Sequence, residues 1–336
     1  MAPPSQLFPR DWVAALLAAG VTPAAFVPDA SRGRFDEEPA GHLAADVLED
    51  TELRVHPVDR TAAAPPVVSF LDGIQQWRVV GYDGVAPIVR GYVAAAVRRR
   101  GPDRRLRTVA QDAREFAVAP LATLGAERRA VLEAHADVID LPDLPPSQPG
   151  PVLEEARRVV DGARQAVERS LAERALRGLG EREWLVVDGL LSVSGKLASH
   201  PRAIGVIKSH GAQFFEGEAL RSALTVPAAH RTSVFRARGG HARNDVYSWY
   251  LRLWPWEGSD LLFGLVRVEA RAGSETIAAA GVTSGWLWRE RAPVSTPDAR
   301  WDRLLYPIHD VETYLRSRAP RDLSIAGGSR LPRTGT

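Results

Sequence analysis

The chain has 336 residues, and its 43 basic and 41 acidic residues leave a formal net charge of +2, which gives no global signal for a polyanionic partner. A chain of this length can bury a large core and hold roughly one to three domains. The absence of cysteine excludes disulfides, cysteine zinc sites, iron–sulfur clusters and thiol catalysis. The first apolar stretch, 12–19, is short and follows Arg10 and Asp11, which indicates an amphipathic helix and not a signal peptide, and no run reaches membrane-spanning length. We therefore expect a cytoplasmic protein with no membrane segment.

Residues 1–64 are expected to form an α-helical N-terminal appendage that ends in a linker. Helical patterning at 10–19 and 41–49 is separated by a polar, acidic stretch. The segment Thr-Ala-Ala-Ala-Pro-Pro at 61–66 is typical of a linker. The main domain is then expected at 65–320, with a flexible tail at 321–336.

Three strands are predicted in close succession at the start of this domain. They are Val67–Asp72, Gln76–Tyr82 and Ala86–Val97, and Asp83-Gly84 supplies a two-residue hairpin turn between the last two. We expect an antiparallel meander that begins with an acidic strand tip.

Helices and strands alternate through the rest of the chain, which favours an α/β fold with a mixed sheet flanked by helices. A proline-rich break at 145–151 precedes the longest apolar-periodic segment. Helices are expected at 126–136, 152–179, 274–291 and 309–318, and strands at 184–188, 203–208, 246–254 and 261–270.

Two aspartates end apolar strand-like runs and are each followed by glycine. They are Asp72 in Phe-Leu-Asp-Gly and Asp188 in Val-Val-Asp-Gly. Carboxylates held at neighbouring strand tips can build a site for a hard divalent metal. Asp-Gly is also a common turn dipeptide, and for either copy alone the turn interpretation is the more frequent one.

The order of these motifs resembles the NurA nuclease family over roughly residues 65–320. The elements that carry the likeness are an acidic strand in a meander, a long helix with a glutamate, and a second strand ending in Asp-Gly-Leu-Leu. The resemblance implies an RNase H-like core that cuts DNA with a divalent metal, Mn²⁺ or Mg²⁺. It also implies a homodimer that works with a HerA-type hexameric ATPase.

The resemblance assigns the catalytic and metal-binding residues one by one. Asp72 and Asp188 match the family's two aspartates, and Glu168 in Arg-Gln-Ala-Val-Glu matches its helical glutamate, with Glu173 as the reserve. His309 matches a C-terminal histidine, and the strand 204–208 ending in Lys208 matches a glycine–aliphatic–lysine strand.

An aromatic residue precedes the family's C-terminal histidine by about two helical turns. Trp301 stands at that distance where the family has tyrosine, and Tyr306 is the alternative. The role of this aromatic residue is therefore left open.

The proposed chemistry is two-metal phosphodiester hydrolysis. We expect Asp72 to bridge the ions, because it lies on the first strand, with Asp188 and Glu168 binding one ion each. His309 would bind a manganese ion or act as general acid, and Lys208 would neutralise the scissile phosphate. On residues alone, Glu168 is equally a solvated helix residue and His309 simply the start of the last helix.

A cluster of arginines is the candidate DNA-binding segment. The alternative is a solvated loop. The residues assigned to DNA binding are Arg98, Arg99, Arg100, Arg104 and Arg105, and Arg107 follows closely.

The sequence therefore predicts a metal-dependent nuclease acting on DNA ends or single strands, in end processing for DNA repair or in antiviral defence. The alternatives are a non-catalytic RNase H-like module that binds nucleic acid or docks an ATPase, and an oligomeric scaffold. No Walker motif, nucleophile elbow or zinc-ligand spacing offers a rival chemistry. A degenerate site would have its carboxylates apart or capped by arginine.

Overall fold

The computed structural model describes seven stretches of the chain. They are residues 12–24, 41–103, 105–141, 149–238, 244–257, 260–291 and 305–320. The expected tail at 321–336, Arg104 and Trp301 lie outside the described residues.

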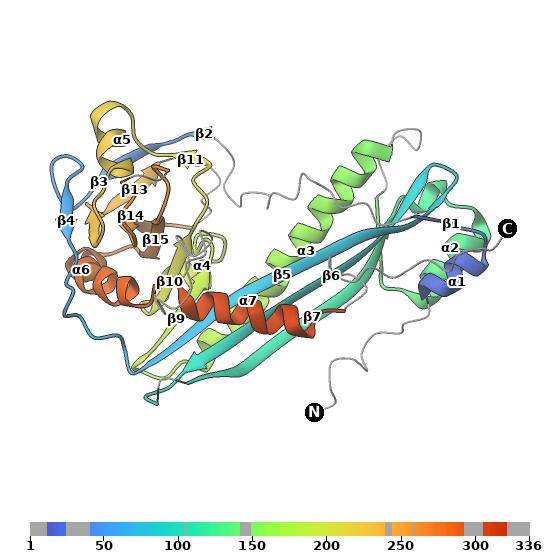
Figure 1. Cartoon of the computed structure of the whole chain (residues 1–336), viewed down its shortest axis with the longest axis horizontal. Helices are drawn as coiled ribbons and strands as arrows, with labels where there is room; N and C mark the ends of the chain where they lie inside the picture. The colour runs from blue at the N-terminus through green and yellow to red at the C-terminus, as the bar shows by residue number, and fades with distance from the viewer. Residues whose placement is uncertain are drawn as a thin grey trace.

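A mixed sheet of 13 strands runs through the described part of the molecule, and helices flank it (Figure 1). The expected α/β architecture is therefore confirmed. Fifteen strands, seven α-helices and a short 3-10 helix (Leu121–Thr123) make up the described secondary structure. The strands are β1 (Thr22–Pro23), β2 (Gly41–His42), β3 (Ala44–Val47), β4 (Val55–Pro57), β5 (Val67–Asp83), β6 (Ala86–Arg100), β7 (Leu106–Ala119), β8 (Val138–Asp140), β9 (Glu183–Asp188), β10 (Ala203–Ile207), β11 (Ala212–Gln213), β12 (His230–Thr232), β13 (Phe235–Arg238), β14 (Val246–Arg252) and β15 (Leu265–Arg271). The helices are α1 (Trp12–Ala18), α2 (Ala126–His135), α3 (Pro149–Arg177), α4 (Gly195–Ser199), α5 (Gly217–Leu224), α6 (Ser274–Arg289) and α7 (Tyr306–Arg318).

The order of the strands places β5 and β9 at the middle of the sheet. The path is β3-β13-β14-β15-β10-β9-β5-β6-β7-β8, with β1, β4 and β12 paired beside it. Strands β5, β9 and β10 are parallel to one another, whereas β6 and β15 run antiparallel to their inner neighbours. The carboxyl ends of β9 and β10 therefore meet on one side of the sheet.

Strand β5 corrects the prediction of two separate strands at 67–72 and 76–82. It is one strand of 17 residues that continues through Gly73. The Asp72-Gly73 dipeptide is thus inside a strand and not a turn. The predicted two-residue hairpin is present, but its turn is one residue later, at Gly84-Val85, because Asp83 pairs with Ala86; Gly84 has φ 59°. Strand β6 pairs with β5 from Val68 to Asp83 and holds it extended beyond the point where the sequence pattern breaks.

Helices α3 and α7 cover opposite faces of the central strands (Figure 1). Successive residues of a strand point to opposite faces, and β5 follows this rule. Leu71 packs in the cluster that includes Leu171 of α3, whereas Phe70 packs in the cluster that includes Ile308 of α7.

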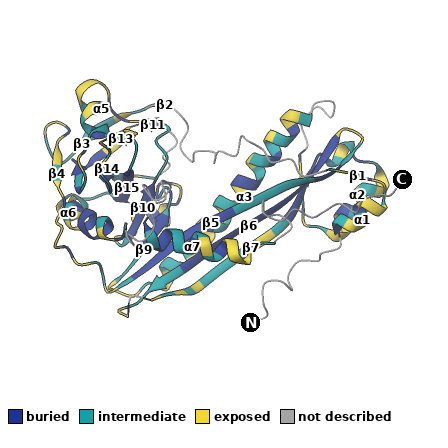
Figure 2. Cartoon of the chain, in the orientation of Figure 1, coloured by how far each residue is buried: buried dark blue, intermediate teal, exposed yellow. Residues whose placement is uncertain are grey.

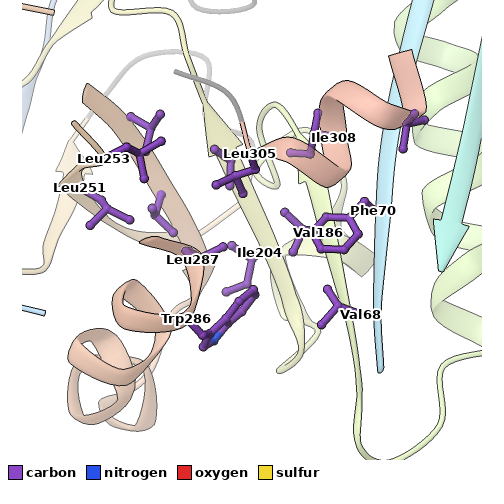
Figure 3. Packing of buried hydrophobic residues seen from close by; sticks show 14 of the residues in the cluster. Val68, Phe70, Val186, Ile204, Leu251, Leu253, Trp286, Leu287, Leu305 and Ile308 are labelled. Carbon is purple, nitrogen blue, oxygen red and sulfur yellow. The ribbon is translucent and has the colours of Figure 1, made fainter. Parts of the chain in front are cut away.

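The largest core cluster joins β5, β9, β10, β14 and β15 to α6 and α7. Figure 3 shows Phe70, Val186 and Ile204 meeting side chains from α6 and α7, among them Trp286 and Ile308. Figure 2 shows the same strands dark where they pass between the helices. Burying such aliphatic and aromatic side chains contributes about 1.5–3 kcal/mol each, which fixes the central strands firmly.

The N-terminal segment corrects the expectation of a helical appendage. The helix predicted at 10–19 is present as α1, but the helix predicted at 41–49 is instead β2 and β3. Strand β3 pairs with β13, and β4 pairs with β12, so this segment adds strands to the main sheet. Pairing with distant strands overrides the local helical pattern.

The other predicted elements agree more closely with the structure. The long helix begins at Pro149, inside the predicted break, and the helices predicted at 126–136, 274–291 and 309–318 are α2, α6 and α7. Strand β15 begins at Leu265, later than predicted, and β7 was not predicted. Within the described residues, no helix is both long and apolar enough to cross a membrane.

Candidate metal centre

The register of β5 and β9 brings the two predicted aspartates to matched positions. The strands are parallel and Leu71 lies opposite Val187, so Asp72 and Asp188 each follow by one residue. Neighbouring strands lie about 4.8 Å apart. Asp72 is buried, with 2% of its surface exposed, and its Oδ1 accepts a hydrogen bond of 2.7 Å from the Gly73 amide.

Helix α3 brings Glu168 to the same region, and glycine makes room for it. A Cβ atom on Gly73 would lie only 2.1 Å from Oε1 of Glu168. Glu168 is 7% exposed, which excludes the solvated-residue interpretation. The reserve residue, Glu173, instead accepts hydrogen bonds from Ser194 Oγ at 2.8 Å and Lys196 Nζ at 2.7 Å.

Lys208 directly follows β10 and lies beside the second aspartate. Its Nζ donates to Oδ2 of Asp188 at 2.7 Å, and both side chains are largely buried. Strand β10 lies between β15 and β9, and its residue Val206 is opposite Asp188. Lys208 follows two residues later, which brings it beside this aspartate.

A small cavity of about 80 Å³ lies between α3 and the end of β9. Glu168 and Asp188 line it together with Gln165, Arg169 and Gly189. The strand that ends in Asp188 turns away at Gly189, whose φ of 132° suits glycine. The cavity is thus reached by two of the predicted carboxylates.

Basic side chains neutralise both of these carboxylates. Arg164 Nη1 lies 2.6 Å from Glu168 Oε1, and also reaches Asp161 and Gln75, while Lys208 holds Asp188. Across the described residues, Asp72, Glu168 and Asp188 do not form a group whose ligating atoms all lie within 4.8 Å of one another. The oxygen donors suit Mg²⁺ or Mn²⁺, and a dication would supply the counter-charge that Arg164 and Lys208 supply here.

His309 approaches the sheet on α7, from the face opposite α3. Its Nε2 lies 3.3 Å from Thr313 Oγ1, and its Nδ1 lies 3.9 Å from the carboxylate of Glu312. Both of these contacts lie within α7. Tyr306, the alternative aromatic residue, begins that helix, and its amide donates to the Glu290 carbonyl at 3.0 Å.

A buried glutamate to which the sequence analysis gave no role in the site holds the loop after Asp188. Glu269 on β15 accepts hydrogen bonds at Oε2 from the amides of Leu191 at 2.8 Å and Ser192 at 3.3 Å. Arg267 donates to its other oxygen at 2.8 Å. The signal was available: two charged residues of opposite sign stand two apart in the otherwise apolar run 265–270.

The arginine cluster lies on the β6–β7 hairpin, and its described members contact acids of this chain. Arg98 pairs with Asp310 at 2.9 Å, Arg99 with Glu183 at 3.3 Å, and Arg100 with Glu290. The backbone amide of Arg105 donates to Asp103, and Arg107 pairs with the same carboxylate, which lowers the pKa of Asp103 to about 2.

A separate group of metal-ligating side chains lies at the junction of β4 and β12. Atoms of Glu49, Asp50 and His56 all come within 4.8 Å of one another, so this group could hold a metal ion. Arg231 holds Glu49 through two bonds of 2.6 and 2.7 Å. Asp50 Oδ2 meets both His56 Nε2 and Ser233 Oγ at 2.7 Å.

Hydrogen bonds lower the pKa of both acids in this group. Burial alone would raise the pKa of Glu49, but the bonds from Arg231 and the Val234 amide outweigh it. For Asp50 the bond from Ser233 is the largest cause of the lowered pKa. Comparison with protein-family models and with curated proteins gave no match.

Proposed function

We propose that the chain is a metal-dependent nuclease that hydrolyses phosphodiester bonds in DNA. The observation that carries the proposal is the register of β5 and β9, which puts Asp72 and Asp188 at matched positions on neighbouring parallel strands. Glu168 of α3 lies against Gly73, the residue that follows Asp72 in β5. The cofactor is Mn²⁺ or Mg²⁺, because the donors are carboxylate oxygens.

Each residue of this site has a different proposed role in hydrolysis. Asp72, Asp188 and Glu168 would hold the ions, which supply an activated water and charge stabilisation when bound. Release of Lys208 from Asp188 would leave its ammonium beside the cleaved phosphate. Glu269 positions the loop that follows Asp188 through the amides of Leu191 and Ser192. His309 is the proposed general acid or additional ligand.

The second candidate function is a non-catalytic module that binds nucleic acid or docks an ATPase. The pairs Arg164–Glu168 and Lys208–Asp188 favour it, because each places a cation where a metal would bind. Either function fits an RNase H-like core, a homodimer and a partner ATPase of the HerA type. The cellular role we propose is DNA end processing or defence against foreign DNA.

Degradation of linear DNA tests the proposal. Single- and double-stranded substrates are incubated with the purified chain and Mn²⁺, Mg²⁺ or EDTA. We expect cleavage with a metal and none with EDTA, and a loss of about a thousandfold in Asp72→Asn and Asp188→Asn, since metal catalysis contributes several kcal/mol.

The matched control is Asp137→Asn, which removes an exposed aspartate at the far edge of the sheet that pairs with Arg114. It should retain full activity. DNA binding without metal-dependent cleavage by the folded wild-type chain would favour the second candidate. Near-normal cleavage by both site variants would overturn the assignment of the metal centre.

A further inference from the structure

A second, larger cavity lies beside the candidate metal centre, among β11, β14 and α5. Its volume is about 260 Å³. Its lining combines aliphatic side chains with four rings, those of Phe214, Phe215, Tyr250 and His210. Gln213, Asp260 and Leu261 lie at its solvent-exposed rim, and Leu261 keeps 42% of its surface exposed.

The chain itself links this cavity to the metal centre. Lys208 contacts Asp188, and His210 follows two residues later in the cavity wall. Two residues span at most about 7 Å. Both features therefore lie beyond the carboxyl ends of the parallel strands β9 and β10, where open α/β sheets commonly bind ligands.

A second connection passes through β15. The guanidinium of Arg267 lies 4.9 Å from the centre of the Phe214 ring. The same Arg267 donates to Glu269, which holds the Leu191 amide in the loop after Asp188. A ligand against Phe214 is therefore separated from the metal-site loop by one buried ion pair.

The size and chemistry of the cavity fit a single planar heterocycle. An apolar cavity of about 150 Å³ accommodates benzene, so 260 Å³ admits a larger ring but not a whole nucleotide. Aromatic side chains stack on any nucleobase. The amide of Gln213 and the carboxylate of Asp260 add a donor and acceptors at the rim, which suit the hydrogen-bonding edge of a base.

We propose that this cavity is a subsite for one unstacked nucleobase of the DNA strand whose phosphate lies at Asp188 and Lys208. The proposal rests on the proposed function, because it takes the substrate to be DNA. It implies that the chain prefers single-stranded or frayed DNA, since a paired base cannot enter the cavity without leaving its stack.

Binding of short oligonucleotides in EDTA tests the subsite without any cleavage. An oligothymidylate is compared with oligomers of equal length that carry one abasic position, moved stepwise along the strand. One position should weaken binding by about fivefold to a hundredfold, the equivalent of one base–aromatic stack. Leu220→Trp, which fills the cavity from α5, should weaken binding of the intact oligomer equally and abolish the abasic effect.

Two further variants keep the test decisive. Leu220→Met preserves volume and should bind as the wild type does. Gln213→Ala changes an exposed rim residue without risk to the fold, and should alter the preference among bases. Circular dichroism verifies that each variant is folded.

The outcomes separate this proposal from the nuclease proposal. Cleavage by the wild type with no effect of the abasic position or of Leu220→Trp would overturn the subsite and leave the nuclease proposal standing. Base-dependent binding that Leu220→Trp abolishes, in a chain that never cleaves, would support the subsite and contradict the nuclease proposal.

Discussion

Two acidic regions of this molecule contain side chains of the kind that bind a metal ion, and they differ in how their charges are arranged. Glu49, Asp50 and His56 form the compact group, with ligating atoms within 4.8 Å. Asp72, Glu168 and Asp188 are more widely spread: Asp72 and Asp188 lie at matched positions on two parallel strands, and Glu168 and Asp188 line one cavity.

The carboxylates of the compact group already have hydrogen-bond partners within the protein. Arg231 binds both oxygens of Glu49, and Asp50 bonds to His56 and Ser233. These bonds tie the segment before β4 to β12, far away in the sequence. In the central group, by contrast, Glu168 and Asp188 line a cavity, Arg164 contacts Glu168, Lys208 contacts Asp188, and glycine keeps space for Glu168. Proximity of metal-ligating atoms therefore does not by itself identify a metal centre, because side chains of the protein already bind these atoms in the compact group.

Breaking the pair between Arg231 and Glu49 should have the largest effect on stability. Arg231→Met leaves a carboxylate that is only 17% exposed without its partner. Loss of one member of such a buried pair costs about 3–5 kcal/mol. Urea unfolding measures this loss.

The control for this prediction is Arg236→Met, because the pair Arg236–Asp245 is half-exposed on both sides. It should cost no more than about 1 kcal/mol. The double variant Arg231→Met/Glu49→Gln should regain part of the lost stability. Equal losses in the two single variants would show that the compact group is not structural.

Gly73→Ala should disturb the central group. The added Cβ would meet Oε1, Cγ and Cδ of Glu168 at 2.1, 2.7 and 2.8 Å, so the glutamate must move. Overpacking of this kind costs about 1–3 kcal/mol, and we expect metal-dependent cleavage to fall with it. Urea unfolding and the DNA cleavage assay measure the two effects.

Gly162→Ala on α3 is the matched control, because a Cβ there meets nothing within 4 Å. Ala in place of a helical glycine should stabilise by about 0.4–1 kcal/mol. Gly73→Ala/Glu168→Ala should recover stability without recovering cleavage. If Gly73→Ala behaves as Gly162→Ala does, Glu168 has no fixed place at the site.

Acid should lower the contribution of the compact group to the free energy of unfolding, by a smaller amount than the substitutions above. The pKa of Glu49 and the pKa of Asp50 lie below their ordinary values of 4.5 and 3.8. The unfolded chain therefore binds these protons at a higher pH than the folded chain does. Their contribution is present in full above about pH 4.5 and is lost as the pH falls through the lowered pKa values.

Urea unfolding between about pH 6 and pH 3 measures how the free energy of unfolding changes with pH. Glu49→Gln should reduce the slope of this change, because one of the two groups no longer titrates. Glu275→Gln, at an exposed glutamate on α6, should leave it unchanged. An unchanged slope in Glu49→Gln would contradict the assignment.

The sequence by itself determined the elements with strong local signals. Helices α2, α6 and α7 and strands β9, β10 and β14 follow from apolar periodicity. The acidic tip of β9 follows from the same pattern. Asp-Gly at 83–84 determined the hairpin because a two-residue turn is a local event. These features depend on residues close together in the chain.

Only the tertiary structure decided how the elements combine. Pairing with β6 carried β5 through Gly73, and pairing with β13 made a strand of residues that look helical. The contact of Glu168 with Gly73 depends on how α3 lies against β5, and the contacts of Glu269 depend on β15 lying next to β10. Each of these contacts joins residues far apart in the sequence, where local propensity carries no information about the partner.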